Sequence, residues 1–210
     1  MDLKLMGKSA IVTGSTAGIG LAIARRLAEE GVAVTITGRS QAKLDTAAAQ
    51  IGGAVNPVLA DPATAEGAAA LIAAVPHTDI LVNNLGIYEA KDFADISDAD
   101  WHHIFEVNVV SGARLARHYF PGMINRDWGR ILFIASESGL LPPAEMIHYG
   151  MTKSAQLAIS RSARASVSSS ISRYAHAGSS SPSSATCLRR YQSGWPSSTS
   201  IFSSVASSTA

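Results

Sequence analysis

The segment Ser9–Gly20 reads SAIVTGSTAGIG, and it decides the fold class of this chain. Its first four residues, Ser9–Val12, form a short apolar run typical of a buried β-strand. The next eight, Thr13–Gly20, form a glycine-rich turn that opens a helix. Glycines let the backbone approach a pyrophosphate closely, and the N–H groups and dipole of a helix N-terminus attract its charge. Glycines also serve plain tight turns, but this position between strand and helix favours nucleotide binding.

Beyond this turn, short apolar runs alternate with helical patterns, which is typical of an α/β fold with a parallel sheet. In the first helix Ile19, Ile23 and Leu27 share one face, and Gly31 suits its C-terminal end. The runs are continuously apolar, as in strands covered on both faces. The strands predicted after Ser9–Val12 are Val32–Thr37, Ala54–Leu59, Ile80–Val82 and Ile131–Ile134. We therefore predict a Rossmann-like, doubly wound parallel sheet in a three-layer α/β/α arrangement.

Two long helices follow from the pattern of the middle of the chain. Ser97 and Asp100, three residues apart, resemble a capping box that starts the first of them. This helix is expected to turn four apolar residues inward: Trp101, Ile104, Phe105 and Val109. The second long helix is expected to begin near Ile147.

Composition and charge narrow the classes of function. The chain has 210 residues, 47% of them hydrophobic, which suits one globular domain. A formal net charge of +1 gives no electrostatic case for nucleic acid or an anionic membrane as partner. The single cysteine, Cys187, is compatible with a reducing cytosol, and Met1–Lys8 lacks the apolar stretch of a secretory signal. We expect a cytoplasmic protein, and we assign no residue to a metal.

The composition changes abruptly near residue 163. Eighteen of the last forty-seven residues are serine, and no Asp or Glu follows Glu145. We therefore divide the chain into a domain over residues 1–163 and an atypical, irregular tail over residues 164–210. The abrupt change is typical of translation in a shifted reading frame, although a divergent natural tail is the alternative. The sheet is then expected to end early on one side and to expose apolar surface.

The end of the second predicted strand selects the cofactor in a dinucleotide-binding fold. An acidic residue there binds the ribose 2′-OH of NAD, whereas a basic residue pairs with the 2′-phosphate of NADP. This chain has Gly38, Arg39 and Ser40 and no acid, which favours NADP(H) over NAD(H). The alternative is that Arg39 is a solvated surface charge.

A candidate catalytic group lies further along the chain. Tyr149 and Lys153 are four residues apart, so on a helix their side chains project from the same face. A nearby ammonium favours phenolate over phenol, so we expect a lowered tyrosine pKa that suits a general acid or base. Ser136, at the end of the fifth predicted strand, is placed to hold the same substrate oxygen. Taken alone, such a Tyr and Lys are usually an amphipathic surface pair.

Together, these elements resemble the short-chain dehydrogenase/reductase family over residues 5–163. The resemblance rests on the turn TGSTAGIG, the run Asn83–Gly86, Asn108, Ser136, and Tyr149 with Lys153. It implies that Tyr149 is the acid or base, that Ser136 positions the substrate oxygen, and that Lys153 binds the nicotinamide ribose. It also implies that Asn108 holds a water of the proton relay. The cofactor-binding residues it implies are Gly14, Ser15, Thr16, Gly18, Ile19, Gly20, Arg39, Ser40, Asp61, Asn84, Gly86, Tyr149 and Lys153.

The expected function is hydride transfer between NADP(H) and a carbonyl or secondary alcohol. Apolar residues before Tyr149 are expected to flank a partly apolar substrate: Leu140, Leu141, Pro142, Pro143 and Met146. The family also has a Pro-Gly turn at the nicotinamide, whereas the only such pair here is Pro121–Gly122, far upstream. The main alternative is therefore a truncated or frame-shifted family member that binds nucleotide without catalysis. A third reading is a partner-binding protein that uses the two long helices, which in the family pack against a second subunit.

Overall fold

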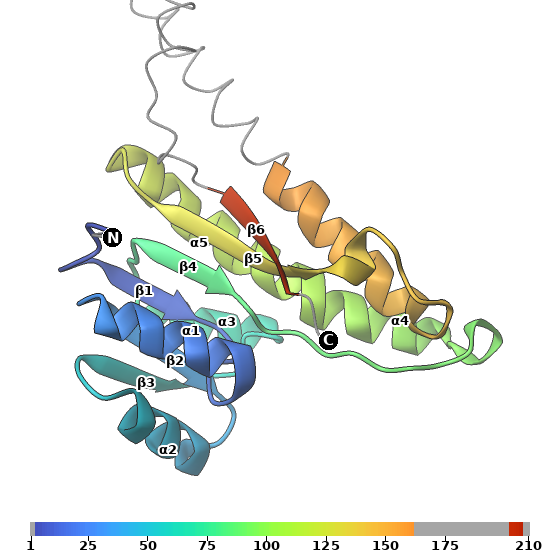
Figure 1. The fold of residues 1–210 in the computed structure, drawn as a ribbon, viewed down its shortest axis with the longest axis horizontal. Coiled ribbons are helices and arrows are strands. Elements are labelled where there is room, and N and C mark those ends of the chain that lie inside the picture. The colour runs from blue at the N-terminus through green and yellow to red at the C-terminus, as the bar shows by residue number, and fades with distance from the viewer. Residues whose placement is uncertain (1–2, 162–201, 208–210) are drawn as a thin grey trace, which may run out of the picture.

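The computed structural model describes residues 3–161 and, for the backbone alone, residues 202–207. These residues form one parallel sheet in the order β3-β2-β1-β4-β5-β6 (Figure 1). The strands are β1 (Ser9–Val12), β2 (Ala33–Gly38), β3 (Val55–Leu59), β4 (Ile80–Asn83), β5 (Arg130–Ser136) and β6 (Phe202–Ser207). The chain runs outward from β1 through β2 to β3 and then returns to the other side of β1 at β4. This reversal of direction is a topological switch point, where open α/β sheets place their ligands at the carboxyl ends of the strands.

Helices cover both faces of the sheet and confirm the predicted three-layer α/β/α fold. They are α1 (Gly18–Glu29), α2 (Gln41–Ile51), α3 (Ala65–Ala74), α4 (Asp98–Phe105), α5 (Ser111–Asn125) and a helix over residues 147–161. Short helical turns occupy Phe93–Asp95, Glu106–Val110, Glu137–Gly139 and Ala144–Met146. Figure 1 shows α1 and α2 in front of the sheet and α3 and α5 behind it.

Each face of the sheet has its own apolar core. Successive side chains of a strand point to opposite faces, so Ile11 packs in the cluster under α3 and α5, whereas Ala10 and Val12 pack in the cluster under α1 and α2. Phe133 and Leu44 are among the largest fully buried side chains, and both are 0% exposed. Burying such a side chain contributes roughly 1.5–3 kcal/mol. Four of the five apolar runs predicted as strands, those of β1, β2, β4 and β5, are therefore largely buried, whereas the edge strand β3 is mostly exposed, with Leu59 at 56%.

The first long helix begins as expected and then departs from a regular α-helix. Ser97 and Asp100 form the predicted capping box, with both hydrogen bonds present. After α4 the chain makes a π-helical turn, Glu106–Val110, before α5 continues. Ile104 and Val109 are buried as predicted, but Trp101 is half-buried and Phe105 is 37% exposed, so the inward placement of Phe105 is wrong.

The sheet does not end where the sequence analysis expects. Phe202–Ser207 pairs in parallel with β5, from Ile131 opposite Phe202 to Ser136 opposite Ser207. Ladder pairing uses backbone N–H and C=O groups, so an edge strand such as β5 accepts a serine-rich partner that has no apolar period. The helix predicted near Ile147 begins at that residue. The rest of the predicted irregular tail lies outside the described residues.

Candidate active site

The predicted site residues come from the carboxyl ends of three neighbouring strands. The glycine turn follows β1, the segment Asn84–Gly86 follows β4, and Ser136 is the last residue of β5. Because β1, β4 and β5 are adjacent and parallel, these ends meet at one edge of the sheet. This edge is the crevice at the switch point between β1 and β4.

The glycine turn needs glycine at particular places. Gly14 and Gly18 have φ angles of +61° and +55°, in the left-handed region that side chains with a Cβ rarely adopt. At Gly20 a Cβ would lie 2.5 Å from the backbone oxygen of Gly14 and 2.5 Å from Asn84 Nδ2. The start of α1 is therefore packed against the turn as closely as a bare backbone permits, which leaves its N-terminal N–H groups at the crevice.

Asn84 and Thr13 fasten this turn to the end of β4. Asn84 Nδ2 donates to the carbonyl oxygens of Thr13 and Gly14, each at 3.0 Å. Thr13 Oγ1 accepts from the backbone N–H groups of Asn84 at 3.1 Å and Leu85 at 3.0 Å. Ser15, predicted to bind cofactor, is 0% exposed; its hydroxyl donates to the carbonyl of Val12 and accepts from the N–H of Thr37. The side chains of Asn84 and Ser15 thus shape the turn from within.

The two residues predicted to select the cofactor lie after β2. The side chain of Arg39 is 82% exposed, and its Nη1 lies 4.0 Å from Asp61 Oδ2. Ser40 is the N-cap residue of α2, and its hydroxyl makes no capping hydrogen bond. A cation, a hydroxyl and a helix N-terminus are therefore adjacent, which is a donor set suited to a phosphate, and the Asp61 carboxylate pairs with the cation of that set.

Tyr149 and Lys153 lie on the helix over residues 147–161, as predicted. Lys153 is 5% exposed, and its Nζ lies 5.5 Å from the centroid of the Tyr149 ring. The ammonium donates to the carbonyl of Ile134 at 2.8 Å and to Gln156 Oε1 at 3.1 Å. Burial disfavours its charge and lowers the pKa of Lys153 from 10.5 to about 8. The helix thus holds a buried amine beside the phenol ring.

Ser136 is held near this helix by the loop that follows β5. Its Oγ accepts from the N–H of Ser138 at 3.2 Å and lies 3.3 Å from Ser138 Oγ. The loop is fastened to the helix because Ser154 Oγ donates to the carbonyl of Gly139 at 2.7 Å. At Gly150, next to Tyr149, a Cβ would lie 2.4 Å from Pro142 Cβ, so the loop and helix touch there as well.

Asn108 joins the same assembly from the π-helical turn. Its Oδ1 accepts from the N–H of Ile87 at 2.8 Å, and its Nδ2 donates to the carbonyl of Ile87 at 2.8 Å and to Thr152 Oγ1 at 3.0 Å. Asn108 is 1% exposed. Its side chain therefore connects the segment after β4 with the helix that carries Tyr149. Gly86 lies against it, since a Cβ there would come within 3.3 Å of Asn108 Oδ1.

Exposed apolar side chains surround this edge. Tyr88 is 75% exposed, and its ring stands edge-on to that of Tyr149 with 6.2 Å between centroids. Leu140 and Leu141, predicted to flank a substrate, are 66% and 73% exposed. Large apolar side chains in water are available for an apolar ligand.

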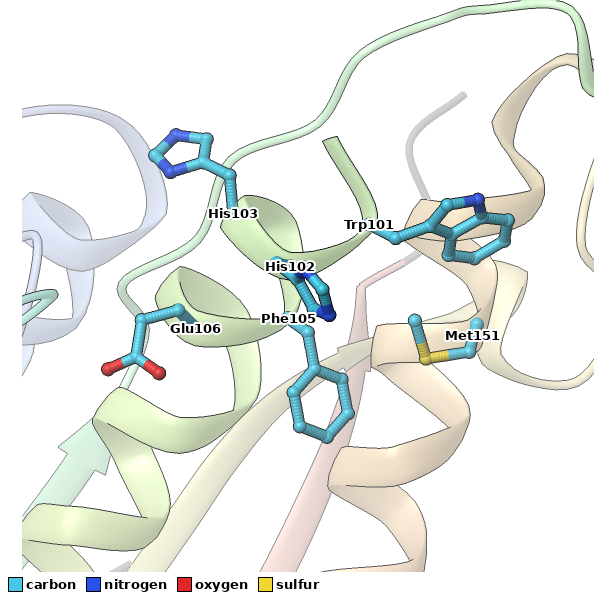
Figure 2. A pocket seen from close by; sticks show the side chains of 6 residues that line it. All are labelled: Trp101, His102, His103, Phe105, Glu106 and Met151. Atoms are coloured by element: carbon cyan, nitrogen blue, oxygen red, sulfur yellow. The ribbon is translucent and has the colours of Figure 1, made fainter. Parts of the chain in front are cut away.

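A separate pocket lies between α4 and the 147–161 helix (Figure 2). Its lining consists of Trp101, His102, His103, Phe105, Glu106 and Met151. Met151 is two residues from Tyr149, and side chains two apart on a helix point in nearly opposite directions. This pocket is therefore on a different side of the helix from the Tyr149–Lys153 pair.

Several residues of the site were not predicted from the sequence: Thr13, Tyr88, Thr152 and Gln156. Gln156 lies three residues after Lys153, so helical spacing alone would have placed it on the same face. No comparable spacing signal exists for Tyr88 or Thr13. Nowhere in residues 3–161 do three or more His, Cys, Asp or Glu gather in a metal-binding group. In the described part of the chain, no helix is long and apolar enough to span a bilayer.

Comparisons with known proteins agree with this geometry. A family model described as short chain dehydrogenase matches residues 8–173. The uncharacterized oxidoreductase YvaG of Bacillus subtilis (strain 168) is 52% identical over 77% of this chain and 63% of its own length. The 3-oxoacyl-acyl-carrier-protein reductase FabG of Aquifex aeolicus (strain VF5) is 34% identical over 77% of this chain and 68% of its own. The chain thus spans less than two thirds of the length of YvaG.

Solved structures show the same likeness. L-sorbose reductase from Gluconobacter frateurii, complexed with NADPH and L-sorbose, has a TM-score of 0.75 and 35% identity. The match covers 80% of this chain and 66% of that one. A xylitol dehydrogenase bound to NAD+ has a TM-score of 0.71 and 28% identity over 79% of this chain and 66% of that one.

Proposed function

The chain belongs to the short-chain dehydrogenase family of NAD(P)-dependent oxidoreductases, and we propose that it transfers hydride between NADP(H) and a carbonyl or secondary alcohol with Tyr149 as acid or base. The observation that carries this proposal is the buried Lys153 ammonium beside the Tyr149 ring. The pair stands at the sheet edge that also carries the glycine turn. This arrangement supports a proposal in which proton transfer and cofactor binding share one crevice.

The residues at this edge fit a dinucleotide. Any Cβ at Gly20 would collide with the turn, so the backbone there can lie close to a ligand. Gly14 and Gly18 provide the turn that a pyrophosphate requires. When bound, a nicotinamide supplies or accepts the hydride. The resemblance assigns three more residues to the cofactor. Thr16 and Ile19 belong to the glycine turn, and Gly86 belongs to the segment after β4.

The chain's own side chains then handle the oxygen and its proton. In the direction of reduction, the Tyr149 hydroxyl gives its proton to the oxygen that becomes the alcohol. The positive charge of Lys153 favours the phenolate that Tyr149 then becomes. Ser136 donates a hydrogen bond to the same oxygen, and because its Oγ already accepts from the N–H of Ser138, that donation is strengthened. Asn108 holds the segment after β4 in place.

Preference for NADP(H) rests on Arg39 and Ser40. The exposed guanidinium and the uncapped N-terminus of α2 suit a 2′-phosphate, and no acid stands at the end of β2 to bind a 2′-OH. The sorbose reductase, which is 35% identical, is described with NADPH, and the more distant xylitol dehydrogenase with NAD+. Arg39→Ala is expected to weaken NADPH binding about tenfold or more and to leave NADH binding nearly unchanged. Equal losses for both cofactors would overturn this preference.

The experiment that tests the function is a turnover assay on the full chain. NADPH oxidation is measured with a panel of ketones, and NADPH affinity is measured separately by its fluorescence. Turnover is expected with carbonyls that carry an apolar group, because Tyr88 lies against the Tyr149 ring and Leu140 and Leu141 are exposed on the loop after Ser136. Fluorescence-detected binding without turnover on any ketone or alcohol would instead support the nucleotide-binding remnant. That alternative draws on the serine-rich sequence after residue 163, which departs from the pattern of the family.

We also propose that two copies of the chain pair through the two long helices, as the resemblance implies. Support comes from the half-exposed apolar side chains of Trp101, Phe105 and Met151 at the pocket in Figure 2. Light scattering on the purified chain is expected to give the mass of a dimer. Phe105→Glu should shift that mass to a monomer, because it places a charge in the apolar contact; an unchanged mass would contradict this arrangement. We also propose a cytosolic location, which the single cysteine, Cys187, supports.

A further inference from the structure

Gln156 is a buried polar side chain in contact with the proposed catalytic amine. It lies on the 147–161 helix, three residues after Lys153, and is 1% exposed. Its Oε1 accepts from Lys153 Nζ at 3.1 Å, and its Nε2 donates to the backbone carbonyl of Asn108 at 2.6 Å. One amide thus bridges the ammonium and the π-helical turn, and both ends of the amide are used.

The contacts of Lys153 show what this bridge does. An ammonium has three N–H donors, and two of them are taken by the Ile134 carbonyl and Gln156 Oε1. The remaining donor is left for the side of the helix where the Tyr149 ring lies. Within residues 3–161 Lys153 makes no ion pair. Of the titratable side chains in that range, only Tyr149 contacts the ammonium.

A neutral amide suits this place better than either obvious substitute. A carboxylate would hold the ammonium more firmly but would cancel much of the positive charge that acts on Tyr149. An apolar side chain would leave the ammonium with one partner fewer and would bury the Asn108 carbonyl without its donor. The amide therefore orients the amine and preserves its charge.

We propose that Gln156 is a positioning residue for the proton-transfer step, holding the Lys153 ammonium beside Tyr149 without neutralising it. This inference rests on the proposed function. It also gives the Asn108 backbone a part in the site, because the Asn108 carbonyl accepts from the Gln156 amide.

The first test does not need turnover. The chain has five lysines, so isotope-labelled lysine allows each ε-amine to be titrated by NMR, and Lys153→Met identifies the signal of Lys153. Gln156→Glu is expected to raise the titration midpoint of Lys153, because a carboxylate favours the ammonium. Gln156→Met, which keeps the length of the side chain, is expected to lower it. Midpoints that stay unchanged, or that move in the same direction in both variants, would overturn the proposal.

The second test separates positioning from binding in the active enzyme. Gln156→Met is expected to lower kcat about tenfold to a hundredfold, since a hydrogen bond to a charged group is lost. The fluorescence-measured affinity for NADPH should stay within about threefold of that of the parent chain. An unchanged kcat would overturn the proposal. If the parent chain shows no turnover, the proposed function fails, and the NMR titration still decides whether Gln156 holds the amine.

Discussion

Around the glycine turn, the polar side chains that shape the turn are hydrogen-bonded to backbone groups. Asn84, Thr13 and Ser15 each make two or more hydrogen bonds to backbone groups of the turn and the neighbouring strands. The 147–161 helix differs: among the residues that the structure describes, no opposite charge pairs with its buried Lys153 amine, and neither ring nitrogen of its fully buried His148 has a hydrogen-bond partner. The first region is built for close fit, whereas the second maintains a charge at an energetic cost, as functional sites commonly do.

The largest effect on stability is expected at the closely packed glycine turn. Gly20→Ala places a Cβ 2.5 Å from the backbone oxygen of Gly14, so the turn must open. Unfolding by denaturant should show a loss of about 3 kcal/mol, and NADPH affinity should fall with it. Gly122→Ala is the matched control, because a Cβ there meets only the end of the Arg126 side chain, at 3.2 Å. If both variants were equally stable, the account of the turn would be wrong.

A substitution in the catalytic region is expected to raise the stability of the chain. Lys153→Met removes a buried charge, so at pH 7 the free energy of unfolding is expected to rise by about 2 kcal/mol while turnover is lost. The pKa of Lys153 is about 8 in the folded chain against an ordinary 10.5, so the unfolded chain binds more protons between these values. The parent chain therefore gains stability as the pH rises from about 8 to 10.5, and the gain of the variant should shrink over that window. A variant less stable than its parent at pH 7 would contradict this account.

A smaller gain in stability is expected from a substitution of His148. His148→Phe removes two buried ring nitrogens that have no hydrogen-bond partner among the described residues. It keeps an aromatic ring against Trp101, whose ring centroid lies 5.8 Å from that of His148. The melting temperature should rise, in line with a gain of about 1 kcal/mol. His77→Phe, at an exposed position between α3 and β4, serves as the control and should leave the melting temperature nearly unchanged. A lower melting temperature for His148→Phe would mean that its ring nitrogens are paired after all.

These two regions also differ in how far the sequence predicts them. The strands β1, β2, β4 and β5 could be predicted because their apolar runs reflect burial on both faces, and the capping box at Ser97 is a local signal. The π-helical turn could not be predicted from the sequence, because one extra residue in a turn does not alter the local composition. That turn places Phe105 partly in water and brings Asn108 to Thr152, 44 residues away. Contacts between distant segments, like the backbone pairing of β6 with β5, are fixed by packing rather than by any motif.

The central claim is that Tyr149 transfers the proton while the glycine turn independently binds the cofactor. The most direct measurement compares Tyr149→Phe with the parent chain in two assays, ketone-dependent NADPH oxidation and NADPH fluorescence. Removing one hydroxyl should lower turnover about a thousandfold and change the dissociation constant of NADPH by no more than about twofold. Turnover within about tenfold of the parent chain would contradict the claim, because another group would then supply the proton.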